Sequence, residues 1–151
     1  MTIAKRLFVA FAVSSGFAWT ALSAAGGDEF PAGRRISLSG YDPVSYFVDG
    51  KPAKGSHKLW YSFDDVVYLF RSSEHRAMFA ADPERYAPQY AGYCAGGVSE
   101  GYKVEADPEA WIIANGRLYV FKFKNRVPEF RKRIDELVAK ANVKWPTVRG
   151  Q

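Results

Sequence analysis

Cysteine and histidine are almost absent from this sequence of 151 residues, which has one cysteine, Cys94, and two histidines, His57 and His75. A lone cysteine excludes any disulfide bond within the chain. The sequence also has no Cys-x-x-Cys or His-x-x-x-His spacing, which excludes the common closed zinc motifs. Any metal ion would therefore need ligands from separate segments of the chain.

Long hydrophobic runs are also missing. The one uncharged apolar run, Leu7–Leu22, follows the basic pair Lys5-Arg6 and is shorter than the ~20 residues that a bilayer span needs. Small residues at 23–25 then provide a signal-peptidase site. We therefore predict a signal peptide over residues 1–25, an exported protein that is periplasmic or secreted, and no transmembrane segment after cleavage.

Acidic residues are fewer than basic ones, 16 against 21, for a net charge of +5, and signal cleavage would remove two of the basic residues. Such a small excess in an exported protein argues against a nucleic-acid partner. Much of the excess lies near the C-terminal helix, at Lys124, Arg126, Arg131, Lys132 and Arg133. This face could meet a protein partner or an anionic membrane surface, with a solvated face as the alternative.

The remaining patterns predict an α+β fold with one domain over residues 36–148, preceded by a flexible lead-in at 26–35. Turn signals at Asp64-Asp65 and Asn115-Gly116 predict two hairpins that build a small antiparallel sheet. Residues 44–48 are expected to be extended. Residues 74–81 and 84–87 are expected to form short helices, the first capped by Ser72 or Ser73 and the second by Asp82. A C-terminal helix over 128–141 is expected to pack on the sheet. The sequence shows no internal repeat.

Several short motifs occur in order along the mature chain. They are Tyr41-Asp42-Pro43-Val44-Ser45, Ser72-Ser73-Glu74-His75-Arg76, Asp82-Pro83-Glu84-Arg85-Tyr86, Gly92-Tyr93-Cys94-Ala95 and Trp145-Pro146. Together they resemble the YHS domain family, in its exported single-domain bacterial branch. The resemblance implies binding or sensing of soft metals such as copper through a DPVCG-like motif and a later Cys-Ser motif. This chain has Ser45 and Arg71-Ser72-Ser73 at those positions, and its own thiol lies further along.

Cys94, His75 and Met78 are the candidate metal ligands, because thiolate, imidazole and thioether groups suit copper or zinc. On this basis we predict a non-enzymatic binding module that binds or senses copper or zinc through its single cysteine. The prediction depends on Cys94 and His75 converging in the fold. No catalytic residue and no other cofactor are predicted.

Two other functions remain open for Cys94. In a protein-interaction or accessory module, Cys94 would be a buried structural residue, since free cysteines are among the most buried residue types. In a thiol redox protein it would be the reactive group and would need a nearby base, such as His75. The sequence contains no motif of a known thiol enzyme.

Overall fold

The structure is a computed structural model, and it describes residues 29–151. The predicted signal peptide and the first part of the predicted lead-in lie outside the described residues. The α+β class is confirmed, and no helix in the described range is long and apolar enough to cross a membrane. The elements in chain order are η1 (Ser37–Gly40), α1 (Ser45–Val48), β1 (Ser56–Phe63), β2 (Val66–Phe70), α2 (Ser73–Ala81), α3 (Pro83–Tyr86), η2 (Gln89–Gly92), α4 (Ala95–Glu100), β3 (Asp107–Ala114), β4 (Arg117–Phe121), η3 (Lys124–Arg126), α5 (Val127–Lys132) and α6 (Ile134–Arg149).

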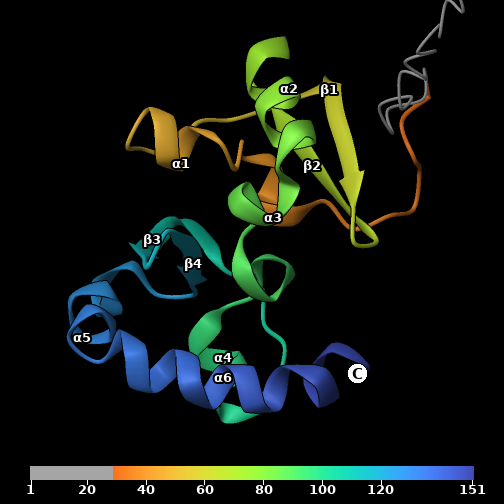
Figure 1. The fold of residues 1–151 in the computed structure, drawn as a ribbon. Helices are drawn as coiled ribbons and strands as arrows, with labels where there is room; N and C mark the ends of the chain where they lie inside the picture. The colour runs from red at the N-terminus through yellow and green to blue at the C-terminus, as the bar shows by residue number, and fades with distance from the viewer. Residues whose placement is uncertain (1–28) are drawn as a thin grey trace, which may run out of the picture.

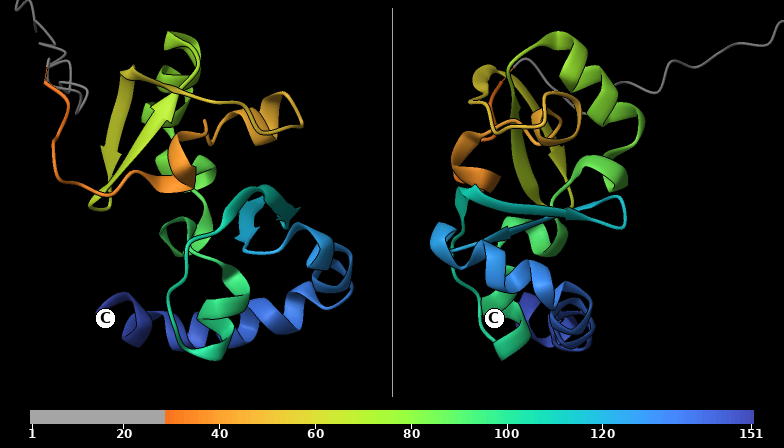
Figure 2. Two further views of the ribbon diagram at one scale, coloured as in Figure 1. Left: turned by 180° about the vertical axis from the view of Figure 1, so that it is seen from behind. Right: turned by 90° about the vertical axis from the view of Figure 1, so that its left-hand side faces the viewer.

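Both predicted hairpins form, and each makes its own two-stranded antiparallel sheet. The residues of both turns, Asp64-Asp65 and Asn115-Gly116, have positive φ, as a two-residue type I′ turn requires. The first hairpin lies with α2 in the upper half of Figure 1, and the second lies below it beside α5. Helix α6 runs along the opposite end of the molecule and packs beside α4 (Figures 1 and 2).

The two hairpins have the same strand register, which reveals an internal repeat. Ser56 pairs with Phe70 before a bulge, and the regular pairing then runs from Trp60 with Leu69 to Phe63 with Val66. Adding 51 to every number of this register gives the register of β3 with β4, including its bulge. The expectation of no internal repeat was therefore wrong. We call residues 37–81 the first repeat and residues 89–132 the second repeat.

An unusual turn before each hairpin supports the same conclusion. The backbone has positive φ at three successive residues of η1, 38–40, and again at three of η2, 90–92. Left-handed conformation costs most non-glycine residues roughly 1–2 kcal/mol, so two successive cases in each turn are rare. Only the third position is glycine in both, at Gly40 and Gly92. Recurrence of such a costly turn 52 residues later points to a duplicated unit.

Few residues are identical at equivalent positions, and those in the hairpins and the following helix are aromatic. The identical pairs there are Trp60 and Trp111, Tyr68 and Tyr119, Phe70 and Phe121, and Phe79 and Phe130. Phe79 packs against Phe70 with ring centroids 5.2 Å apart, and Phe130 stacks on Phe121 at 4.7 Å. Each repeat therefore holds its helix on its hairpin through the same aromatic pair.

The two short helices predicted over 74–81 and 84–87 form as α2 and α3, helix α4 was not predicted, and the predictions differ from the structure at both ends of the chain. Ser72 caps α2 by accepting from the His75 backbone N–H, and Asp82 caps α3 in the same way, as predicted. The segment expected to be extended is instead the helix α1. The single C-terminal helix expected over 128–141 is divided at Arg133, whose φ of −131° and ψ of 30° are not helical. Beyond it, α6 continues to Arg149.

Two separate sets of hydrogen bonds attach the second repeat to the N-terminal part of the chain. Arg35 binds Glu105 with two hydrogen bonds of 2.8 Å and donates to the Ala91 carbonyl, so the end of the predicted flexible lead-in is attached to the second repeat. Tyr46, which is 1% exposed, donates to the Pro108 carbonyl at 2.8 Å. Burial raises the pKa of Tyr46 far above its usual value, so the hydroxyl keeps its proton for this bond.

Candidate functional site

The candidate site is a pocket of about 260 Å³ in the second repeat, enclosed by α4, α5, α6 and the end of β4. Its deep wall is apolar and contains Cys94, Phe130 and Leu137, each of them 5–6% exposed. Its rim carries the half-exposed rings of Tyr102 and Phe123. The volume lies just below the ~300 Å³ at which the usual range of ligand pockets begins, so the pocket suits a small molecule.

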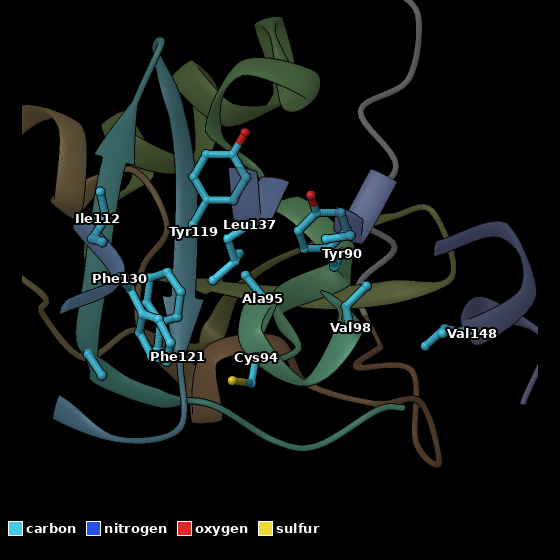
Figure 3. Packing of buried hydrophobic residues seen from close by; sticks show 12 residues of the cluster. Tyr90, Cys94, Ala95, Val98, Ile112, Tyr119, Phe121, Phe130, Leu137 and Val148 are labelled. Atoms are coloured by element: carbon cyan, nitrogen blue, oxygen red, sulfur yellow. The ribbon is translucent and has the colours of Figure 1, made fainter. Parts of the chain in front are cut away.

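Cys94 stands at the start of α4, and its sulfur accepts a hydrogen bond from the Lys122 backbone N–H at 3.2 Å. In Figure 3 its side chain lies beside the stacked rings of Phe121 and Phe130. The cysteine is buried in the core and also lines the pocket. Its sulfur can therefore be reached only from the pocket side, by a molecule that enters there.

Asp42 holds the position in the first repeat that Cys94 holds in the second, and the two side chains accept equivalent hydrogen bonds. Asp42 Oδ2 accepts from the Arg71 backbone N–H at 3.0 Å, and Arg71 follows β2 as Lys122 follows β4. Asp42 and Cys94 also donate their own backbone N–H groups to equivalent carbonyls, those of Ala53 and Val104. The two side chains thus occupy corresponding sites in the two repeats.

His75 belongs to the site of the first repeat and not to that of Cys94. Its Nδ1 lies 2.7 Å from Asp42 Oδ2, and because the carboxylate accepts, the imidazole N–H donates. His75 is 7% exposed and Asp42 is fully buried. The imidazole thus covers the buried carboxylate, at the sequence position that Arg126 holds in the second repeat.

The three predicted metal ligands are distributed over the two repeats. Met78 packs against the core of the first hairpin, with Phe79, whereas Cys94 belongs to the core of the second. Across residues 29–151, no group of three or more His, Cys, Asp and Glu side chains is placed to hold a metal ion. His57 lies on the exposed part of β1, where its ring contacts Phe30.

Positive charge predominates in the lining of the pocket, with four basic side chains and two acidic ones. Glu136 binds Lys140 at 2.7 Å, and this bond lowers the pKa of the Glu136 carboxyl. Arg126 and Arg133 both bind Glu129, which does not line the pocket. Lys122 has no carboxylate partner in the described part of the chain, and its ammonium lies 5.5 Å from the centroid of the Phe123 ring.

Sequence reasoning identified Cys94 but missed the side chains that surround it. Gly96 and Gly97 line the pocket at the positions that Val44 and Ser45 occupy in the first repeat. Arg126 stands where the first repeat has His75. The spacing of 52 residues between Gly40-Tyr41-Asp42 and Gly92-Tyr93-Cys94 was the signal that could have aligned these positions.

The basic C-terminal face is partly neutralised by one carboxylate of β3 and one of α5. Lys124 binds Glu109, and Arg126 and Arg133 share Glu129. Arg131 and Lys132 are exposed and form no ion pair within the described residues. A protein partner on this face therefore stays a prediction.

Comparison with known proteins gives no match: no family model, no curated protein and no solved structure is similar to the chain.

Proposed function

We propose that the protein is an exported, non-enzymatic binding module of the YHS type, which takes its ligand in the pocket beside Cys94. The observation that carries the proposal is the pocket itself, which combines a buried apolar wall, the chain's only thiol and a basic rim. Concave sites with apolar walls and a few polar groups are the usual form of ligand sites. The resemblance to YHS domains supports a binding role, and the predicted signal peptide supports export.

The first repeat has no such open space at its equivalent site, and this difference supports a binding role for the pocket of the second repeat. There the space over Asp42 is closed by His75, and no polar side-chain atom buried in the described residues lacks a hydrogen-bond partner. In the second repeat two glycines line the pocket, and the Arg126 guanidinium lies at its border, 5.0 Å from the centroid of the Phe130 ring, so the space beside Cys94 stays open. Structural packing alone would favour filling this space.

The side chains of the pocket do not fit a closed soft-metal site. Such sites use three or four protein ligands, commonly thiolates and imidazoles. The pocket offers one thiol, and its other charged acceptors are the carboxylates of Glu100 and Glu136. The proposal therefore rests on the pocket, and a copper or zinc ion stays a prediction from the sequence.

Alkylation of Cys94 tests whether small molecules reach the site. Iodoacetamide should modify the folded protein with a rate proportional to reagent concentration and faster than global unfolding would allow. In the Gly96→Ala variant, the new methyl group would lie 3.6 Å from the Cys94 sulfur and 3.5 Å from the Phe130 ring, in ordinary contact with both. We expect this variant to react more slowly and, as a glycine replacement within α4, to be more stable by about 0.5–1 kcal/mol.

Mass spectrometry measures the rate, and hydrogen exchange gives the unfolding rate for comparison. If both proteins react no faster than their own global unfolding allows, and Gly96→Ala slows the reaction only by as much as it stabilises the fold, then Cys94 is an inert core residue and the proposal is overturned. Reversible oxidation of Cys94 by low-molecular-weight disulfides, without non-covalent binding, would favour the thiol redox alternative.

A titration with metal ions tests the sequence-based prediction separately. Because Cys94 is the only thiol, we expect the reduced, signal-free protein to leave both Cu(I) and Zn(II) with a competing chelator under anaerobic conditions. Stoichiometric metal binding that is lost in Cys94→Ser would contradict this expectation. The additional effect of His75→Ala would then show whether the two side chains meet in solution.

A further inference from the structure

From the charge and shape of the pocket, we infer that its ligand is a small organic anion with an aromatic or apolar body. The inference rests on the proposed function, because it names the chemistry of the molecule that the pocket beside Cys94 would take. Its basis is the division of the pocket into an apolar interior and a basic rim.

The interior selects for an apolar body. Phe130 and Leu137 are buried in the wall, and the sulfur of Cys94 is a weak hydrogen-bonding group. At the mouth, Tyr102 and Phe123 are 53% and 51% exposed, which is high for such large side chains. A flat ring entering between them would bury apolar surface that the protein leaves exposed to water.

The rim selects for negative charge. Four basic side chains line the pocket, and only Lys122 among them has no acidic partner in residues 29–151. Arg126 and Arg133 share the single carboxylate of Glu129, so their two charges are balanced by one. A carboxylate or phosphate of the ligand would balance the remaining positive charge of these side chains, whereas a cationic ligand would be repelled.

In the first repeat, the protein's own side chains complete the hydrogen bonds of the equivalent site. There a buried carboxylate, Asp42, meets the N–H of His75 and the backbone N–H of Arg71. In the second repeat Cys94 replaces that carboxylate, and a basic residue, Arg126, replaces the imidazole. The Lys122 backbone N–H is met by the Cys94 sulfur and Arg126 by Glu129, so the second repeat keeps a basic residue here without the buried carboxylate. A bound anion would supply that negative charge.

The test uses 2-naphthoate as the anionic probe and 2-naphthamide as its uncharged counterpart. Both are titrated into the signal-free protein labelled with nitrogen-15, and binding is read from amide shifts at Gly96, Gly97 and Lys122. We expect naphthoate to bind more tightly than naphthamide and to lose affinity with added salt. Lys122→Met should weaken naphthoate about threefold to fivefold and leave naphthamide unchanged.

Lys132→Met is the matched control, because Lys132 is exposed on the neighbouring helix α5 and does not line the pocket. It should leave both affinities unchanged. Equal affinities for the two probes, both lost in Gly96→Ala, would overturn the anion inference and leave the pocket as a binding site. No shifts with either probe, together with an unreactive Cys94, would overturn the proposed function as well.

Discussion

Replacing Phe79 by alanine is expected to lower the free energy of unfolding by about 3–5 kcal/mol, the usual range for a buried phenylalanine. Phe79 is fully buried at the centre of the first repeat. Its ring contacts four other aromatic rings, of which those of Tyr68 and Phe70 are nearest, with centroids at 4.9 Å and 5.2 Å. Removing the ring leaves a cavity that these rigid side chains cannot close. Urea unfolding followed by circular dichroism measures the change.

Phe130→Ala is the matched control, since Phe130 is the equivalent residue of the second repeat. It stacks on Phe121, the equivalent of Phe70, but it also borders the pocket. Fewer contacts are lost there, and water can enter the space, so we expect a cost of about 2–3 kcal/mol. A cost for Phe130→Ala as large as that for Phe79→Ala would mean that the pocket is closed in solution.

The sequence predicted the elements that depend on neighbouring residues. The hairpin turns were recognisable because Asp64-Asp65 and Asn115-Gly116 adopt the left-handed conformations that two-residue turns need. Helices α2 and α3 were recognisable from their capping residues, Ser72 and Asp82. All of these signals act over four or fewer residues, so no knowledge of the distant chain was required.

A local cap and tertiary contacts together decided the conformation of residues 44–48, which the sequence predicted incorrectly. Residues 44–48 have the composition of a strand, but Asp42 accepts from the Val44 backbone N–H at 2.8 Å and starts a helical turn there. That turn lets Val44 and Tyr46 reach two different core clusters. Since β propensity mainly reflects packing, a four-residue segment follows its contacts.

The candidate site was predictable only in part, because it depends on the repeat. Cys94 was identified because it is the one thiol. His75 was predicted to bind the same metal ion as Cys94, although nothing in the sequence indicates how far apart the two side chains lie. The two repeats share their strand register and four aromatic pairs, while the residues at the positions of Asp42 and His75 differ in the second repeat. Asp42 and Cys94 share no chemistry that a sequence pattern could match. Their equivalence appears only in their backbone partners, Arg71 and Lys122.

Replacing His75 by alanine should lower the free energy of unfolding by about 2–4 kcal/mol, a large effect for a residue in the first turn of a short helix. Asp42 is fully buried and is held by three N–H donors, those of Val44, Arg71 and the His75 imidazole. Removing the imidazole leaves a buried carboxylate with one donor fewer and a cavity above it. Thermal and urea unfolding measure the loss.

The equivalent substitution in the second repeat, Arg126→Ala, provides the control for His75→Ala. Arg126 is exposed and bonds only to Glu129, so its removal should change stability by less than about 0.5 kcal/mol. In an Asp42→Ala background, His75→Ala should cost much less than it does in the wild type, because its partner is already absent. Equal costs in the two backgrounds would contradict the pairing and assign the effect of His75 to packing alone. A strong coupling would instead show that the buried carboxylate of the first repeat is satisfied by the imidazole of His75, a pairing that Cys94 and Arg126 do not make in the second repeat.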